Sequence, residues 1–146
     1  MIDYYKCQYH FNASHSFDGN KEQVHSHTFT MTLYIRNHSA GDMDFKRLDR
    51  MIEIFLGRYE RLYLNELPCF VGNASVEAMG DYFYEQLKIK LSEMNVELMQ
   101  LDIGDTPLGV YQVCDRILLP TINERRSREN LAAILSYKKQ MPDQKK

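Results

Sequence analysis

Two histidines begin the most regular alternating stretch of the chain, residues 25–36. The odd positions of this stretch hold His25, His27, Phe29, Met31, Leu33 and Ile35. The even positions are mostly Ser, Thr, Tyr and Arg. Alternation with a period of two is typical of a half-buried β-strand, because successive side chains point to opposite faces. The pattern therefore predicts a strand in which both histidines share the face that continues into the core.

A third histidine belongs to the preceding segment, residues 2–13, which also predicts a strand. Its more apolar odd face, from Tyr5 to Ala13, is continued by His15. Only a short connection separates His15 from His25, so an antiparallel pair would bring both strand ends together. The three imidazoles could then hold one metal ion, since a catalytic zinc typically takes three protein ligands and leaves one position open. Three ordinary strand-end histidines remain the alternative, because H-x-H is a weak motif.

The other two histidines are not expected to be ligands. His10 has the opposite parity to His15, and His38 falls in a predicted turn.

Helical spacing follows the two strands, from Phe45 to Leu62 and again from Val76 to Leu91. Asp42 or Asp44 could cap the first helix, and Ser75 the second. Two short strands are then predicted around the turn G-D-T-P, and a last helix after Pro120. The order ββααββ predicts an α+β fold, a four-stranded antiparallel sheet with two helices on one face.

Charge and hydropathy exclude several classes of function. The 146 residues suit one domain, and the formal net charge of -2 argues against nucleic acid or an anionic membrane as a partner. No apolar run is long enough to cross a bilayer, and the N-terminus lacks the apolar core of a secretory signal. We therefore expect a cytoplasmic protein.

Several short motifs resemble those of the 6-pyruvoyl-tetrahydropterin synthase and 6-carboxytetrahydropterin synthase family. F-N-A-S-H, ending at His15, is similar to the family's F-x-A-x-H, and H-S-H-T-F to its H-G-H followed by an aromatic residue. The family's D-F, L-N, T-x-E and E-T motifs correspond to Asp44-Phe45, Leu64-Asn65, Ser75-x-Glu77 and Asp105-Thr106. Their order and spacing agree over roughly residues 2–115.

The resemblance implies the tunnelling fold for residues 1–118, with residues 119–146 as a C-terminal helical extension. It also implies a homo-oligomer, a hexamer of two trimers with active sites between subunits. The expected cofactor is Zn²⁺, held by His15, His25 and His27.

The expected substrate of such a protein is a dihydropterin. By resemblance, Asp105, Thr106 and Glu77 would bind it, and the reaction would be triphosphate elimination or side-chain cleavage by a lyase. Similar proteins act in tetrahydrobiopterin, folate-related or deazaguanine (queuosine) biosynthesis, and the sequence does not choose among these pathways.

The family's acid–base residues are missing from this chain. No cysteine lies between His15 and His25, where Lys21 and Glu22 stand instead. The family's Asp-His pair ahead of L-N corresponds to Glu60 and Arg61, and an arginine is a poor proton shuttle.

Two interpretations of this altered set follow. In the first, Glu22 is the base, Lys21 lowers its pKa or binds a substrate oxygen, and Arg61 meets an anionic group. In the second, the protein binds zinc and a pterin without catalysing the reaction. A zinc ion that only steadies an oligomer, and an exposed Lys21–Glu22 pair without a role, are the structural alternatives.

Overall fold

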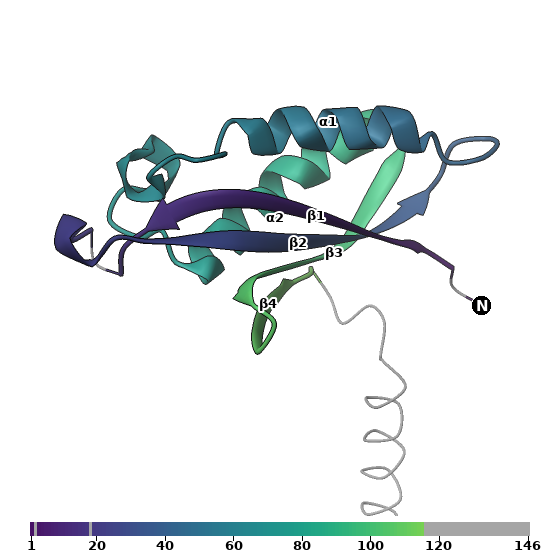
Figure 1. Cartoon of the computed structure of the whole chain (residues 1–146). Coiled ribbons are helices and arrows are strands. Elements are labelled where there is room, and N and C mark those ends of the chain that lie inside the picture. The colour runs from purple at the N-terminus through teal and green to yellow at the C-terminus, as the bar shows by residue number, and fades with distance from the viewer. Residues whose placement is uncertain (2, 18, 116–146) are drawn as a thin grey trace, which may run out of the picture. The chain divides into compact units, whose positions relative to one another are not determined.

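The computed structural model describes residues 1, 3–17 and 19–115 of the chain (Figure 1). The strands are β1 (Tyr5–His15), β2 (His25–Asn37), β3 (Val96–Thr106) and β4 (Gly109–Val113). The helices are α1 (Phe45–Gly57) and α2 (Val76–Glu93), with short 3₁₀ helices at Lys21–Gln23, Leu64–Glu66 and Pro68–Phe70. The predicted order ββααββ is confirmed. The helix predicted after Pro120 lies outside the described residues.

The four strands form one antiparallel sheet in the order β1-β2-β3-β4. Both helices lie on the same side of this sheet, as Figure 1 shows. The sheet and the helices belong to one compact unit, Met1–Asp115. The predicted α+β architecture, with two helices on one face of a four-stranded sheet, is therefore confirmed.

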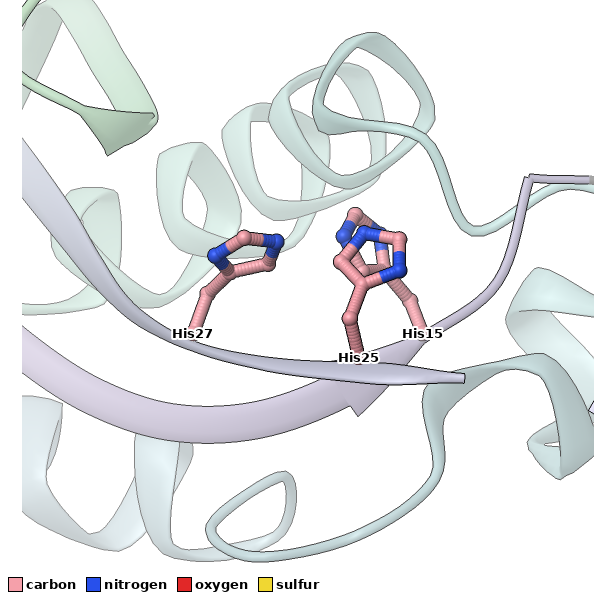
Figure 2. A group of neighbouring side chains, drawn as sticks. All are labelled: His15, His25 and His27. Carbon is pink, nitrogen blue, oxygen red and sulfur yellow. The ribbon is translucent and has the colours of Figure 1, made fainter. Parts of the chain in front are cut away.

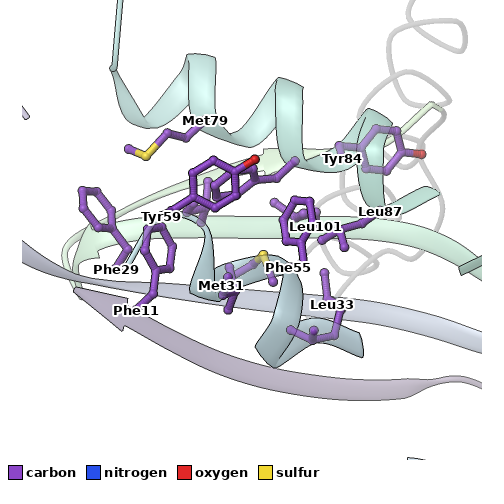
Figure 3. Packing of buried hydrophobic residues seen from close by; sticks show 14 of the residues in the cluster. Phe11, Phe29, Met31, Leu33, Phe55, Tyr59, Met79, Tyr84, Leu87 and Leu101 are labelled. Atoms are coloured by element: carbon purple, nitrogen blue, oxygen red, sulfur yellow. The ribbon is translucent and has the colours of Figure 1, made fainter. Parts of the chain in front are cut away.

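The register of β1 and β2 follows the predicted parity. Phe11 lies opposite Phe29, Ala13 opposite His27, and His15 opposite His25. The odd residues of β2 from Phe29 to Ile35 are fully buried under the helices, where they meet aromatic and aliphatic side chains such as Phe55 (Figure 3). The histidines thus continue the core face toward one end of the sheet.

Side-chain caps fix where both helices begin. The carboxylate of Asp44 accepts a hydrogen bond from the Arg47 N–H at 3.1 Å, and the Ser75 hydroxyl accepts one from the Ala78 N–H at 3.1 Å. Each cap satisfies a backbone donor that has no partner within the helix. Asp44 rather than Asp42 is therefore the cap of α1.

α1 ends at Gly57, earlier than the apolar spacing up to Leu62 predicts. The chain after it turns to run beside the end of β1. The Arg61 N–H donates to the Asn12 carbonyl at 2.6 Å, and the Ser14 N–H donates to the Leu62 carbonyl at 3.0 Å. Arg61, in the turn that follows α1, has a φ of 59°, in the left-handed region. Residues 61–62 thereby extend the edge of the sheet that carries His15.

The hairpin between β3 and β4 turns later than the G-D-T-P signal predicts. β3 continues to Thr106, which lies opposite Gly109, and the pairing shifts register between Ile103 and Thr106. A Cβ at Gly104 would lie 2.8 Å from the Gly109 carbonyl oxygen. Glycine is therefore required here for the close approach of the two backbones. In the part of the chain that the structure describes, none of the helices has the length and apolar character needed to span a bilayer.

Candidate metal centre

Three imidazoles gather where β1 ends and β2 begins (Figure 2). The ring centroids are 4.5 Å apart for His15 and His25, 4.6 Å for His25 and His27, and 5.2 Å for His15 and His27. One nitrogen of each ring lies within 4.8 Å of the corresponding nitrogens of the other two. The predicted cluster of three histidines is therefore formed, with the donor type and number that a catalytic zinc takes.

Backbone carbonyls orient two of the three rings. His15 donates from Nδ1 to the Ala74 carbonyl at 2.8 Å, and His25 donates from Nδ1 to the Gln23 carbonyl at 3.0 Å. A carbonyl only accepts, so Nδ1 bears the proton and Nε2 keeps its lone pair in each neutral ring. Hydrogen bonds of this kind fix the tautomer of metal-binding histidines.

The free nitrogen of His15 is the clearest sign of a missing partner. Its Nε2 is buried and has no hydrogen-bond partner among the described residues. A buried polar atom without a partner costs free energy, and native proteins contain few of them. A metal ion bound by the three imidazoles would satisfy this atom, so the residues fit the zinc that the sequence predicts.

His27 is disposed toward the neutral, metal-binding state. Burial lowers the pKa of its imidazole, and the neighbouring His15 and His25 lower it further, while the Asp105 carboxylate acts in the opposite direction. Only the neutral ring offers a lone pair to a metal.

The second 3₁₀ helix and Tyr63, just before it, hold the end of β1 in place. Asn65 accepts from the Ser16 N–H at 2.9 Å through Oδ1, and its Nδ2 donates to the Ser16 carbonyl at 3.1 Å. The hydroxyls of Ser16 and Tyr63 also share a hydrogen bond of 2.6 Å. These contacts immobilise the residue that follows His15. The sequence reasoning matched Asn65 to a family motif but assigned neither Asn65 nor Tyr63 to the site.

A cavity of about 560 Å³ opens beside the histidines. Its lining includes His15, His25, Glu77, Asp105 and Tyr111. Two of the predicted substrate-binding residues, Glu77 and Asp105, are thus brought to one cavity with two predicted metal ligands. Tyr111 was missed, although its odd position in a strand after Asp105 is a signal that could have pointed to it.

Thr106 lies in a different place. It lines a depression of about 550 Å³ together with Thr28, Thr30 and Thr32, and Asp105 borders both this depression and the cavity. Alternation along the strands accounts for this, because Thr106 follows Asp105 directly and the even residues of β2 point away from the helices.

The three candidate catalytic residues do not line the cavity. Lys21 and Glu22 are exposed in the 3₁₀ helix ahead of β2, where the Lys21 ammonium lies 3.0 Å from the Glu66 carboxylate. The Arg61 side chain is 87% exposed, and its Nε is 4.0 Å from a Glu60 carboxylate oxygen. Glu60 itself accepts hydrogen bonds from the backbone and side-chain nitrogens of Asn12. Glu60 and Arg61, which correspond to the family's Asp-His pair, thus make their contacts at the edge of the sheet.

Comparison with known proteins assigns this chain to a family. The family model described as 6-pyruvoyl tetrahydropterin synthase matches residues 4–115. No curated protein matches the chain by sequence.

Solved structures share the fold at low sequence identity. The Caenorhabditis elegans 6-pyruvoyl tetrahydropterin synthase is 17% identical, with a TM-score of 0.66 over 78% of this chain and 96% of that chain. A Plasmodium vivax 6-pyruvoyltetrahydropterin synthase, in which a catalytic glutamate is replaced by alanine, is 16% identical, with a TM-score of 0.55 over 80% and 100%. An uncharacterized Wolinella succinogenes protein is 11% identical, with a TM-score of 0.55 over 79% and 100%. This likeness confirms the predicted tunnelling fold. Since the family model matches most of the chain, the protein belongs to the 6-pyruvoyl tetrahydropterin synthase family.

Proposed function

We propose that this chain is a zinc-dependent lyase that acts on a dihydropterin, by triphosphate elimination or side-chain cleavage. The observation that supports this most directly is the buried Nε2 of His15, which has no partner among the described residues and belongs to a three-histidine cluster beside a cavity. A structural zinc usually has four protein ligands, whereas three imidazoles beside a cavity suit a site that receives a ligand.

The cavity offers groups that complement a pterin. The amino and ring N–H groups of a pterin are donors, and the carboxylates of Glu77 and Asp105 are acceptors on the cavity wall. The ring of Tyr111 and the side chain of Val110 provide a less polar wall for a planar molecule. Thr106 lines the other depression, so Glu77 and Asp105 are the substrate-binding residues of this proposal within the cavity.

The histidines would hold the metal, and other residues would move protons. Zinc supplies Lewis acidity to an oxygen of the bound substrate. Glu22 is our candidate base because it lies three residues before His25 and because a glutamate is the catalytic residue of the P. vivax protein. Lys21 and Arg61 are exposed cations, suited to a phosphate of the substrate rather than to proton transfer at neutral pH.

A homo-oligomer, a hexamer of two trimers, is part of the proposal. β1 and β4 are the outer strands of the sheet. Outer strands present unpaired backbone groups, which pairing with further copies would satisfy. Such assembly could also bring Lys21, Glu22 and Arg61 to the cavity of a neighbouring copy.

The test is turnover by the zinc-loaded protein. Triphosphate release from dihydroneopterin triphosphate, or cleavage of a sepiapterin-like compound, should be detected and should fall on Glu22→Ala. Glu66→Gln is the matched control, since this exposed carboxylate contacts Lys21 but has no proposed role. Unchanged turnover in Glu22→Ala would refute the assignment of the base.

The alternative is a zinc- and pterin-binding protein without catalysis. Saturable pterin binding with no turnover of either class of substrate would favour it. A purified protein that takes up no zinc, even when zinc is added, would refute both functions.

A further inference from the structure

The carboxylate of Asp105 lies against the histidine cluster. Its Oδ2 atom is 3.6 Å from the Nε2 of His27 and 3.9 Å from the Nε2 of His15. The side chain is three-quarters buried, with 25% of its surface exposed. Asp105 is therefore directed toward the imidazoles although it also borders the cavity.

These separations are too long for hydrogen bonds, since a contact of 3.6 Å between donor and acceptor is not one. They are close to the spacing of two ligands on one ion. Zinc binds nitrogen and oxygen at about 2.0–2.2 Å, so two ligands at a tetrahedral zinc are roughly 3.3–3.6 Å apart. The distances from Asp105 to His27 and His15 approach this range without any rearrangement.

The sheet explains why an aspartate reaches this position. Ile103 lies opposite Met31 and Gly104 opposite Thr30, which puts Asp105 on the histidine face, diagonal to His27. The close contact of the hairpin backbones at Gly104 and the register shift after Ile103 fix the backbone on either side. The short side chain then extends over the imidazoles.

We propose that Asp105 is a fourth, displaceable ligand that closes the metal centre when no substrate is bound. The inference rests on the proposed function and specifies the resting state of the same site. A substrate oxygen would replace the Asp105 carboxylate, which could then turn toward the cavity. Glu77, which borders the cavity and is in no ion pair with the histidines, would bind the pterin edge as the substrate oxygen replaces Asp105.

Cobalt(II) in place of zinc tests this proposal without any turnover, because its visible spectrum reports coordination. Azide is the probe, as a small anion that binds an open position. In the wild-type protein azide should leave the spectrum unchanged. In Asp105→Asn and Asp105→Ala azide should change the spectrum at a saturable concentration, and affinity for zinc should fall by at least roughly tenfold, as it does when even outer-shell partners are lost.

Glu77→Gln is the matched control, since it removes another carboxylate of the cavity. It should keep the wild-type affinity for zinc, and azide should leave its cobalt spectrum unchanged. Azide binding to the wild-type protein with the affinity seen in Asp105→Ala would overturn the inference, and this measurement needs no stable variant. Equal zinc affinity in the wild-type protein, Asp105→Asn and Asp105→Ala would overturn it as well. A wild-type protein that binds neither metal would instead refute the proposed function.

Discussion

The His15 imidazole donates from Nδ1 to the carbonyl oxygen of Ala74 across 2.8 Å, joining the end of β1 to the loop that precedes α2. The bond fixes the ring so that Nε2, the buried atom without a described partner, faces the other two imidazoles. The same loop ends at Ser75, the cap of α2, and Glu77 lies in the first turn of that helix. One hydrogen bond thus relates the metal centre to the cavity wall.

Removal of any one of the three histidines should abolish zinc-dependent stabilisation. With free zinc at roughly a hundred times its Kd, binding to the native state adds about 2.7 kcal/mol to the free energy of unfolding. This gain should appear in the wild-type protein and vanish in His15→Ala, His25→Ala and His27→Ala. Urea unfolding with and without zinc measures it.

His10→Ala is the matched control for this series. His10 lies on the same strand as His15 but has the opposite parity, and its Nδ1 is 3.0 Å from the Thr30 hydroxyl. The zinc-dependent gain should persist in this variant. A gain that disappears in His10→Ala, or persists in His27→Ala, would contradict the assignment of the ligands.

Asn65→Ala should destabilise the fold by about 2–6 kcal/mol, the sum for two buried backbone groups. The variant leaves the N–H and the carbonyl of Ser16 without partners in a buried position, at about 1–3 kcal/mol for each group. Zinc affinity should fall too, because Ser16 follows His15. Asn20→Ala, which removes one exposed hydrogen bond to the Glu22 N–H, should cost under about 1 kcal/mol. Equal losses in the two variants, measured by urea unfolding, would refute a special role for Asn65.

The histidine cluster could be predicted from the sequence because strand parity alone determines it. His25 and His27 share one face in any regular strand, and a short connection brings His15 beside them in an antiparallel pair. The register that places His15 opposite His25 is what this argument requires. No packing detail from the helices enters it.

The surroundings of Asp105 could not be predicted in the same way. The pairing of β3 shifts register twice, once against Tyr34 and Ile35 and once between Ile103 and Thr106. The first shift exchanges the faces, so the buried parity of Val96 and Leu98 does not carry on to Leu101, Ile103 and Asp105. Resemblance suggested Asp105 as a pterin ligand, but its distance from His27 depends on these irregularities.

The backbone contact of Arg61 could not be predicted by counting along the chain. Its position relative to Leu64-Asn65 matched a family residue that acts at the site. The left-handed backbone at Arg61 instead turns its N–H to the Asn12 carbonyl and leaves the guanidinium exposed. A dihedral angle of this kind is unusual for an arginine, and the local sequence does not predict it.

Gly80→Ala should destabilise the protein although alanine favours helices. The substitution gains about 1 kcal/mol of helix propensity in α2. The new Cβ would lie 2.6 Å from Cδ1 of Tyr111, a ring held by a hydrogen bond to Asp81, and overpacking of this kind costs about 1–3 kcal/mol. Thermal unfolding should therefore show a net loss.

Two further variants separate these effects. Gly57→Ala in α1 should be neutral or stabilising, because nothing lies within 4 Å of its added Cβ. In a Tyr111→Ala background, the loss caused by Gly80→Ala should become smaller, since only Ile103 Cγ2, 3.1 Å from the added Cβ, still crowds it. An unchanged loss in that background would show that the contact with Tyr111 is not the cause.

Glu60 should make the sheet edge sensitive to acid. Hydrogen bonds from the Asn12 backbone and side chain lower the pKa of its carboxyl below the ordinary value of about 4.3. A carboxyl with a depressed folded pKa stabilises the protein fully above its unfolded pKa, and this contribution is lost as pH falls through the folded pKa. The free energies of unfolding of wild-type protein and Glu60→Gln should therefore differ at pH 6 and converge as the pH falls through the lowered pKa of folded Glu60. The difference should be small because the carboxylate is partly exposed. Glu93→Gln, at the end of α2, is the control, and an equal pH dependence of all three proteins would show that the Asn12–Glu60 contact contributes no stability.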